Sequence, residues 1–424
     1  MLSLSTLKSV RGLPQFSALR HRDYRLTWYS SMLSGAAMFS FVVAVSWKVL
    51  VSSDSSAWVG IITFSAMLPF LLVSPIGGLL GDTLDRRFLV LIMTAISAVI
   101  VGAMAIISAS GHLELWLVAV LAFSLGTARA IQEPAFAALI PNQVPKDDLL
   151  NAIVLTGATR HGARFFGLLI AGPLLAVDAI GVNGVLVLSA FFHLMAAVQM
   201  HRVGTRSRGE ANPERGMVGK ILEGLVYIYT NQTLAVFILL VAFHCALVMS
   251  FESILPILSR QSLGADDGSA IAYLYVGFGA GAMVGMFALA GIRDDRRKGQ
   301  VLLWTGLASG VAPLLLAFST NLATATLASA AMGATQATFM AITNTYVQLI
   351  VPDRLRSRIT SLYILHAGGI MAFANLGYGF IADAFSAAPI LIITGTLFLV
   401  VMVGLGGGQP SLRHVYRTGL VPAV

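Results

Sequence analysis

The chain has 424 residues, of which 11% are charged and 57% belong to the hydrophobic set AVILMFWYC. Soluble globular proteins carry roughly 25% charged residues. This composition therefore excludes a secreted enzyme, a nucleic-acid-binding domain and a disordered protein, and it leaves a helical protein that crosses a membrane many times. The single cysteine, Cys245, excludes an intrachain disulfide framework.

Long stretches with almost no charge mark the predicted membrane spans. A helix needs about 20 apolar residues to cross the hydrocarbon core, and it must satisfy its backbone polar groups internally. The basic first 25 residues and the long apolar run after them argue against a signal peptide. We predict twelve transmembrane helices, at residues 26–51, 57–81, 88–109, 115–140, 150–176, 180–200, 233–257, 268–292, 300–318, 321–350, 358–382 and 386–406.

Lysine and arginine are distributed unequally between the loops on the two sides of the membrane. With the N-terminus inside, 22 of the 27 basic residues fall in cytoplasmic segments, Arg260 falls in an outer loop, and four lie within spans. Because positive charge is retained on the cytoplasmic side, the sequence predicts that both termini are cytoplasmic. The net charge of +8 then reflects topology and contact with anionic lipid headgroups, and no nucleic-acid partner is expected.

Short sequence echoes indicate that the chain contains two related halves. The triplet DRR at 85–87 recurs at 295–297, and Leu-Ile at 139–140 recurs at 349–350, both at an offset of 210 residues. Two parallel six-helix repeats place a binding cavity at their interface. The predicted organisation is an N-terminal cytoplasmic segment (1–25), a first six-helix half (26–200), a cytoplasmic linker with an amphipathic helix (201–232), a second half (233–406) and a cytoplasmic tail (407–424).

The loop after the second predicted span reads GGLLGDTLDRR at 77–87. It resembles the signature loop G-x-L-A-D-x-x-G-R-R of the major facilitator superfamily, which lies between spans 2 and 3. Gly81 replaces the alanine of that pattern, and Asp85 replaces the later glycine. Asp85, with shorter matches around residues 134–145, 163–167, 344–353 and 361–363, is similar to a branch of bacterial exporters related to the enterobactin exporter.

The resemblance implies an all-α membrane protein with the major facilitator fold, in the cytoplasmic (inner) membrane of a bacterium. It also implies that the loop is a cytoplasmic gate. Asp82 is expected near the N-terminus of the eleventh span, around Ser357, where the helix dipole favours an anion; a simple topological anchor is the alternative. The two neighbouring glycines, Gly77 and Gly78, let helices approach closely. The gate residues are Gly78, Asp82, Asp85, Arg86 and Arg87.

Ionisable residues within spans are costly in lipid and mark candidate sites. Arg129 and Glu133 are four residues apart, so they share a helix face and can pair. Structural alternatives remain for the others, which include snorkelling to the interface for Glu252 and hydrogen-bonded packing for the histidines. The proton-coupling candidates are Glu133 and Glu252, and the substrate-cavity candidates are Arg129, Arg160, Arg164 and His244.

These features favour a monomeric secondary transporter that exports a small organic molecule, such as a siderophore, an antibiotic or a drug-like compound, by proton antiport. The excess of mid-span arginines favours anionic or electron-rich substrates. Uptake or facilitated diffusion of a small anionic metabolite is the alternative within transport. A non-transporting sensor or assembly protein, or a membrane enzyme, represents other classes. The sequence has no P-loop, HExxH motif or Cys/His metal cluster, so we expect no enzyme activity, cofactor or metal.

Overall fold

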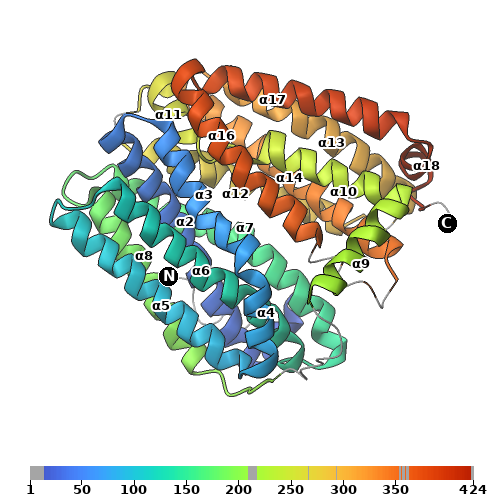
Figure 1. The fold of residues 1–424 in the computed structure, drawn as a ribbon, viewed down its shortest axis with the longest axis horizontal. Coiled ribbons are helices and arrows are strands. Elements are labelled where there is room, and N and C mark those ends of the chain that lie inside the picture. Colours follow the sequence, from blue (N-terminus) through green and yellow to red (C-terminus); the bar gives the residue numbers. More distant parts are fainter. Residues whose placement is uncertain are drawn as a thin grey trace. The chain divides into compact units, whose positions relative to one another are not determined.

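The computed structural model describes residues 14–208, 217–265, 267–292, 294–352, 355, 359 and 362–421. Within these residues the chain forms helices joined by short turns (Figure 1). It divides into two compact units, the first made of residues 1–45 and 72–211 and the second of residues 46–71 and 212–424. The second unit thus includes the end of the first predicted span and most of the second.

The first unit contains six helices and two short 3-10 turns. Several starts follow local rules, as where Asp85 accepts a hydrogen bond from the backbone N–H of Phe88 (3.1 Å) and so caps the helix that follows. The elements are η1 (Pro14–Arg20), α2 (Arg22–Ser53, whose last eight residues belong to the second unit), α4 (Ser74–Thr83), α5 (Arg86–Ala109), α6 (Leu115–Leu139), η2 (Ile140–Asn142), α7 (Lys146–Leu175) and α8 (Gly181–His201).

The second unit holds the remaining helices and three π-helical segments. Asn231 and Asn321 cap two of its helices through their side-chain oxygens. The elements are α3 (Ser56–Leu72), α9 (Met217–Thr230), α10 (Gln232–His244), η3 (π, Cys245–Met249), α11 (Leu255–Leu263), α12 (Ser269–Ala290), α13 (Asp295–Ala317), α14 (Leu322–Ile350), η4 (π, Leu365–Gly369), α16 (Ile370–Phe385), α17 (Ala387–Val401), η5 (π, Met402–Gly406) and α18 (Pro410–Thr418).

Nine helical stretches in the described part of the chain are long and apolar enough to cross a membrane. The other three predicted spans correspond to α3 with α4, to α7 and to α14. Helix α7 carries several charges and α14 is rich in threonine, which lowers their hydropathy. The all-helical, many-span fold class predicted from the sequence is confirmed.

Two spans that we predicted as continuous are interrupted. The second breaks between α3 and α4 at Val73, and the seventh leaves helical geometry between Ser250 and Ile254. In each case the following helix has a proline in its first turn, where the missing N–H costs nothing. Hydropathy measures the apolar content of a segment and not the continuity of its backbone. It therefore could not predict these two breaks.

The surface and the interior of the helices fit a lipid environment. Val99, Ile106 and Phe287 are 71%, 73% and 71% exposed, as expected where hydrocarbon is the solvent. Helices in lipid associate through close packing rather than through the hydrophobic effect. Accordingly, a Cβ at Gly281 of α12 would lie 1.8 Å from the carbonyl oxygen of Ala330 on α14, so only glycine permits this approach.

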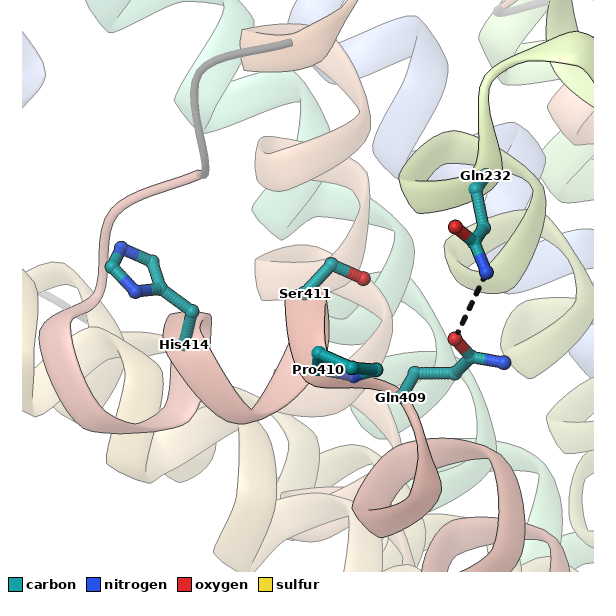
Figure 2. Close-up of a pocket in the computed structure, with 5 residues that line it drawn as sticks. All are labelled: Gln232, Gln409, Pro410, Ser411 and His414. Atoms are coloured by element: carbon teal, nitrogen blue, oxygen red, sulfur yellow. Dashed lines mark hydrogen bonds between the residues drawn. The ribbon is translucent and has the colours of Figure 1, made fainter.

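The C-terminal helix α18 packs against its own unit. Leu412 and Val415 are fully buried, and the hydroxyl of Tyr346 on α14 donates to the carbonyl oxygen of Gly419 (3.2 Å). Figure 2 shows an open pocket where α18 begins, in which Nε2 of Gln232 lies 3.2 Å from Oε1 of Gln409. The segment predicted only as a tail therefore carries an ordered, docked helix.

Candidate functional site

The predicted ion pair on α6 is present in the structure. Nη2 of Arg129 lies 3.2 Å from Oε1 of Glu133, and the two side chains are 23% and 43% exposed. Pro134 follows directly and lies inside the helix, where it cannot donate to the carbonyl of Ala130. The pair is therefore accessible and sits where the helix ladder is already weakened.

The glycine-framed loop packs helix α4 against this part of α6. A Cβ at Gly77 would lie 2.6 Å from Cα of Ile131 and 2.8 Å from the carbonyl oxygen of Ala130, between the two members of the pair. A Cβ at Gly78 would have no atom within 4 Å. Our prediction that both glycines permit close packing is thus correct for Gly77 and wrong for Gly78, which faces open space.

A second arginine of the first unit lies against an aromatic ring. The guanidinium carbon of Arg164 on α7 is 4.4 Å from the centroid of the Phe39 ring on α2. The helices meet closely one turn away, since a Cβ at Gly167 would lie 2.7 Å from Cα of Ala36. Arg160, four residues earlier, is exposed. A guanidinium over an aromatic face can also contact planar or electron-rich groups.

The described residues of the loop that we predict to be a gate fasten the end of the first unit where α4 meets α5. Arg86 donates to the carbonyl oxygens of Gly81 (3.0 Å) and Ala138 (3.2 Å) and to Oγ of Ser207 (3.1 Å). Arg87 donates to the carbonyl of His201. Both arginines thus tie the α4–α5 turn to neighbouring segments. The side chain of Asp82 and residues 356–358, its expected partners, lie outside the described residues.

Asp23 reinforces the same end of the unit. Its carboxylate accepts hydrogen bonds from the backbone N–H groups of Gly204 (3.1 Å) and Thr205 (2.7 Å) and from the Thr205 hydroxyl (2.6 Å). Burial raises the pKa of this carboxyl, but the hydrogen bonds to its charged form outweigh burial and hold the pKa below the usual 3.8. The ionised form therefore holds the start of the linker.

His244 lies in the interior of the second unit. It has no exposed surface, and its ring packs between those of Phe339 and Phe398, at centroid distances of 4.7 and 5.0 Å. Neither ring nitrogen has a hydrogen-bond partner among the described residues. This placement puts His244 in the aromatic core of the second unit, and we do not include it in the proposed site.

The interrupted seventh span is a feature that sequence reasoning missed. The π-helical segment ends at Ser250, which is buried. Side chains of α14 and α16 form hydrogen bonds with backbone groups in and after this segment. Gln336 donates to the carbonyl of Val248 (3.0 Å), Tyr378 donates to that of Ala246 (2.7 Å), and Asn375 accepts from the N–H of Ser253 (3.2 Å). The sequence signal that could have indicated this break is Ser250, Glu252 and Ser253 shortly before Pro256.

The predicted coupling residue Glu252 lies in this break and is half-buried. The described residues contain no group of three or more His, Cys, Asp or Glu side chains that would hold a metal ion. The first unit presents the Arg129–Glu133 ion pair and the Arg164 guanidinium over the Phe39 ring.

Comparison with solved structures identifies the fold. The fold matches a mutant of the nucleoside transporter NupG with a TM-score of 0.72 at 11% identity, covering 91% of this chain and 99% of that one. It matches a bacterial homologue of the lysosomal transporter Spinster with a TM-score of 0.70 at 15% identity, covering 94% and 97%. The fold is that of major facilitator superfamily transporters.

The family follows from the sequence. The family model described as transmembrane secretion effector matches residues 13–410, and the chain belongs to this family. It is also 23% identical over 348 residues to the multidrug efflux pump Tap of Mycolicibacterium fortuitum, which covers 80% of this chain and 83% of that protein.

Proposed function

We propose that this protein exports a small organic molecule by proton antiport, through alternating access of the two halves of the major facilitator fold. The membership in the secretion effector family and the distant similarity to a multidrug efflux pump support the outward direction. The observation that carries the coupling is the accessible Arg129–Glu133 pair on α6. Resemblance to the enterobactin-exporter branch supports siderophores, antibiotics or drug-like compounds as the substrate class.

The pair offers a way to make substrate and proton exclude each other. A substrate with neighbouring acceptor and donor groups can accept from the Arg129 guanidinium and donate to the ionised Glu133 carboxylate. A proton on Glu133 occupies the oxygen that the substrate donor needs, so the protonated carrier binds substrate more weakly. Mutual exclusion of two ligands at one site is the condition for antiport, because the carrier returns loaded with one or the other.

Charge at the site favours neutral or anionic substrates over cationic ones. The described part of α6 and α7 within the predicted spans carries three arginines, Arg129, Arg160 and Arg164, against one acid, Glu133. Arg164, whose guanidinium lies over the Phe39 ring, supplies a planar cation for an electron-rich or aromatic substrate group. We propose that these residues line the substrate path in the first half.

The position in the cell is part of the proposal. The excess of basic residues in alternate loops supports an inner-membrane protein with both termini in the cytoplasm, and we propose that it acts as a monomer. The predicted boundaries of the halves, 26–200 and 233–406, remain our proposal, with Asp82 acting as a gate on the cytoplasmic side.

Transport into inverted membrane vesicles tests the function. With the interior acidified, antiport drives candidate substrates into vesicles that contain the protein, and collapse of the pH gradient releases them. Glu133→Gln keeps an acceptor oxygen but cannot exchange a proton, so it should stop gradient-driven accumulation and spare exchange of substrate for substrate. Asp178→Asn, at an exposed acid between α7 and α8, is the matched control. Accumulation at the wild-type level by the Gln variant would remove Glu133 as the coupling site.

The sign of the gradient that drives accumulation separates the alternatives. If an acidic exterior drives uptake into right-side-out vesicles, the protein is a symporter, and the uptake hypothesis replaces the export hypothesis. Flux of an anionic metabolite without any response to the pH gradient indicates facilitated diffusion. The absence of flux with any compound favours the hypothesis of a non-transporting sensor or assembly protein.

A further inference from the structure

The turn between α2 and α3 is held by an acid at the far end of the chain. The carboxylate of Asp383 on α16 accepts hydrogen bonds from the backbone N–H groups of Ser56 and Ala57 (3.1 Å for Ala57) and from the Ser55 hydroxyl (2.5 Å). The first two are free N–H groups of the first turn of α3, where the helix dipole favours an anion. Asp383 thus caps a helix more than 300 residues away in sequence.

A second charged contact holds the same turn. Nη2 of Arg260 on α11 pairs with Oδ1 of Asp54, and both side chains remain largely accessible, at 41% and 75% exposed. Arg260 is the one basic residue that we assign to an outer loop. Asp54 itself adopts a left-handed backbone conformation with φ of 53°. The turn is therefore fixed by polar contacts at its surface.

Beneath these contacts two glycines let α3 and α16 touch. A Cβ at Gly379 would lie 2.6 Å from the carbonyl oxygen of Ser56 and 2.9 Å from Cα of Gly60. Gly379 is one helical turn before Asp383, so the close crossing and the capping carboxylate belong to the same face of α16. At Gly377, two residues earlier, a Cβ would meet no atom within 4 Å.

We propose that Asp54, Ser55, Ser56, Arg260 and Asp383 form an outer clasp, which holds the outer ends of the first two spans against the seventh and eleventh and opens when substrate leaves. This inference rests on the proposed transport function. Its contacts are few, polar and reachable by water, so they can exchange for water at low cost. The α12–α14 contact, by comparison, brings glycine against backbone and has no such polar substitute.

Accessibility of one buried position reports the state of the clasp without any transport. Ser56 has no exposed surface, and its hydroxyl has no partner among the described residues, so Ser56→Cys keeps the capped N–H intact. The measurement is made with Cys245→Ala, which removes the other thiol. Right-side-out vesicles are treated with a membrane-impermeant maleimide, and the labelling rate of the new cysteine is followed. Reaction from this side also checks that the turn is external.

Asp383→Ala removes both carboxylate oxygens, and with them all three hydrogen bonds, and should raise the labelling rate on the order of tenfold. Arg260→Ala should raise it less, because an exposed pair is worth little. Asp178→Ala, at an exposed acid of the first unit, should leave the rate unchanged. A valine at position 379 should push α3 and α16 apart, so Gly379→Val should raise the labelling rate. Gly377→Val should not, because a Cβ there meets no atom within 4 Å.

Labelling that is equally slow in Asp383→Ala and wild type, at equal amounts of folded protein, would overturn the clasp. Equal acceleration by Asp178→Ala would also overturn it, since the effect would then be general loosening. The two proposals fail separately. Faster labelling in a protein that transports nothing leaves the clasp and rejects the transporter function. Proton-driven export with unchanged labelling leaves the function and rejects the clasp.

Discussion

Replacing Gly281 with alanine tests whether α12 and α14 are held by direct backbone contact. The added Cβ would lie 1.8 Å from the carbonyl oxygen and 2.6 Å from the carbonyl carbon of Ala330. No side-chain rotation relieves this overlap, because the obstructing atoms are backbone. Gly333, on the facing helix, meets the carbonyl oxygen of Phe278 at a similar 1.9 Å. The two helices must therefore separate along the interface to admit one methyl group.

The magnitude follows from that separation. An ordinary carbon–oxygen contact requires the helices to move apart by roughly 1.5 Å, and a gap of 0.5–1 Å already forfeits a quarter to a half of each dispersion contact. Overpacking typically costs about 1–3 kcal/mol, and backbone against backbone belongs at the upper end. Alanine has a higher helix propensity than glycine, which offsets this cost by about 1 kcal/mol. The net expectation for Gly281→Ala is a loss of about 2 kcal/mol in the free energy of unfolding.

Thermal unfolding in detergent, followed by intrinsic fluorescence, measures this change. At about 2–4 °C per kcal/mol for a unit of this size, Tm should fall by roughly 4–8 °C. Gly377→Ala is the control, because a Cβ there meets nothing within 4 Å and gains only the propensity. A Tm for Gly281→Ala equal to or above that of Gly377→Ala would refute the inference that glycine is required for this interface.

Three further predictions concern single positions. Asp82→Asn should reduce transport while membrane insertion stays normal, and equal transport rates at equal expression would leave Asp82 as an anchor. Because the folded-state pKa of Asp23 is lowered, its contribution to stability is complete above about pH 4 and is lost as pH falls through the folded pKa; the Tm difference between wild type and Asp23→Asn should therefore shrink between pH 7 and about pH 3. Ser386, at φ 67° and ψ 171°, occupies a region that suits glycine, so Ser386→Gly should raise Tm, by an amount on the order of 1 kcal/mol in stability, and an unchanged or lower Tm contradicts the strain.

Part of the candidate site could be read from the sequence because its geometry is local. Arg129 and Glu133 meet because residues four apart share a helix face whatever surrounds them. Asp85 caps α5 for the same kind of reason, through a contact three residues along the chain. Gly78 shows where this reasoning ends, because whether a glycine touches a neighbour depends on which way its helix is turned.

Composition and the placement of charge determined the class of protein, since a bilayer imposes its length and polarity on each helix separately. Only the tertiary structure decided which spans are interrupted, that His244 lies in an aromatic core, and that Asp383 caps α3. These features depend on contacts between residues distant in sequence, such as the 326 positions that separate Ala57 from Asp383. Hydropathy and spacing along one segment carry no information about such partners, because the packing of other helices brings them together.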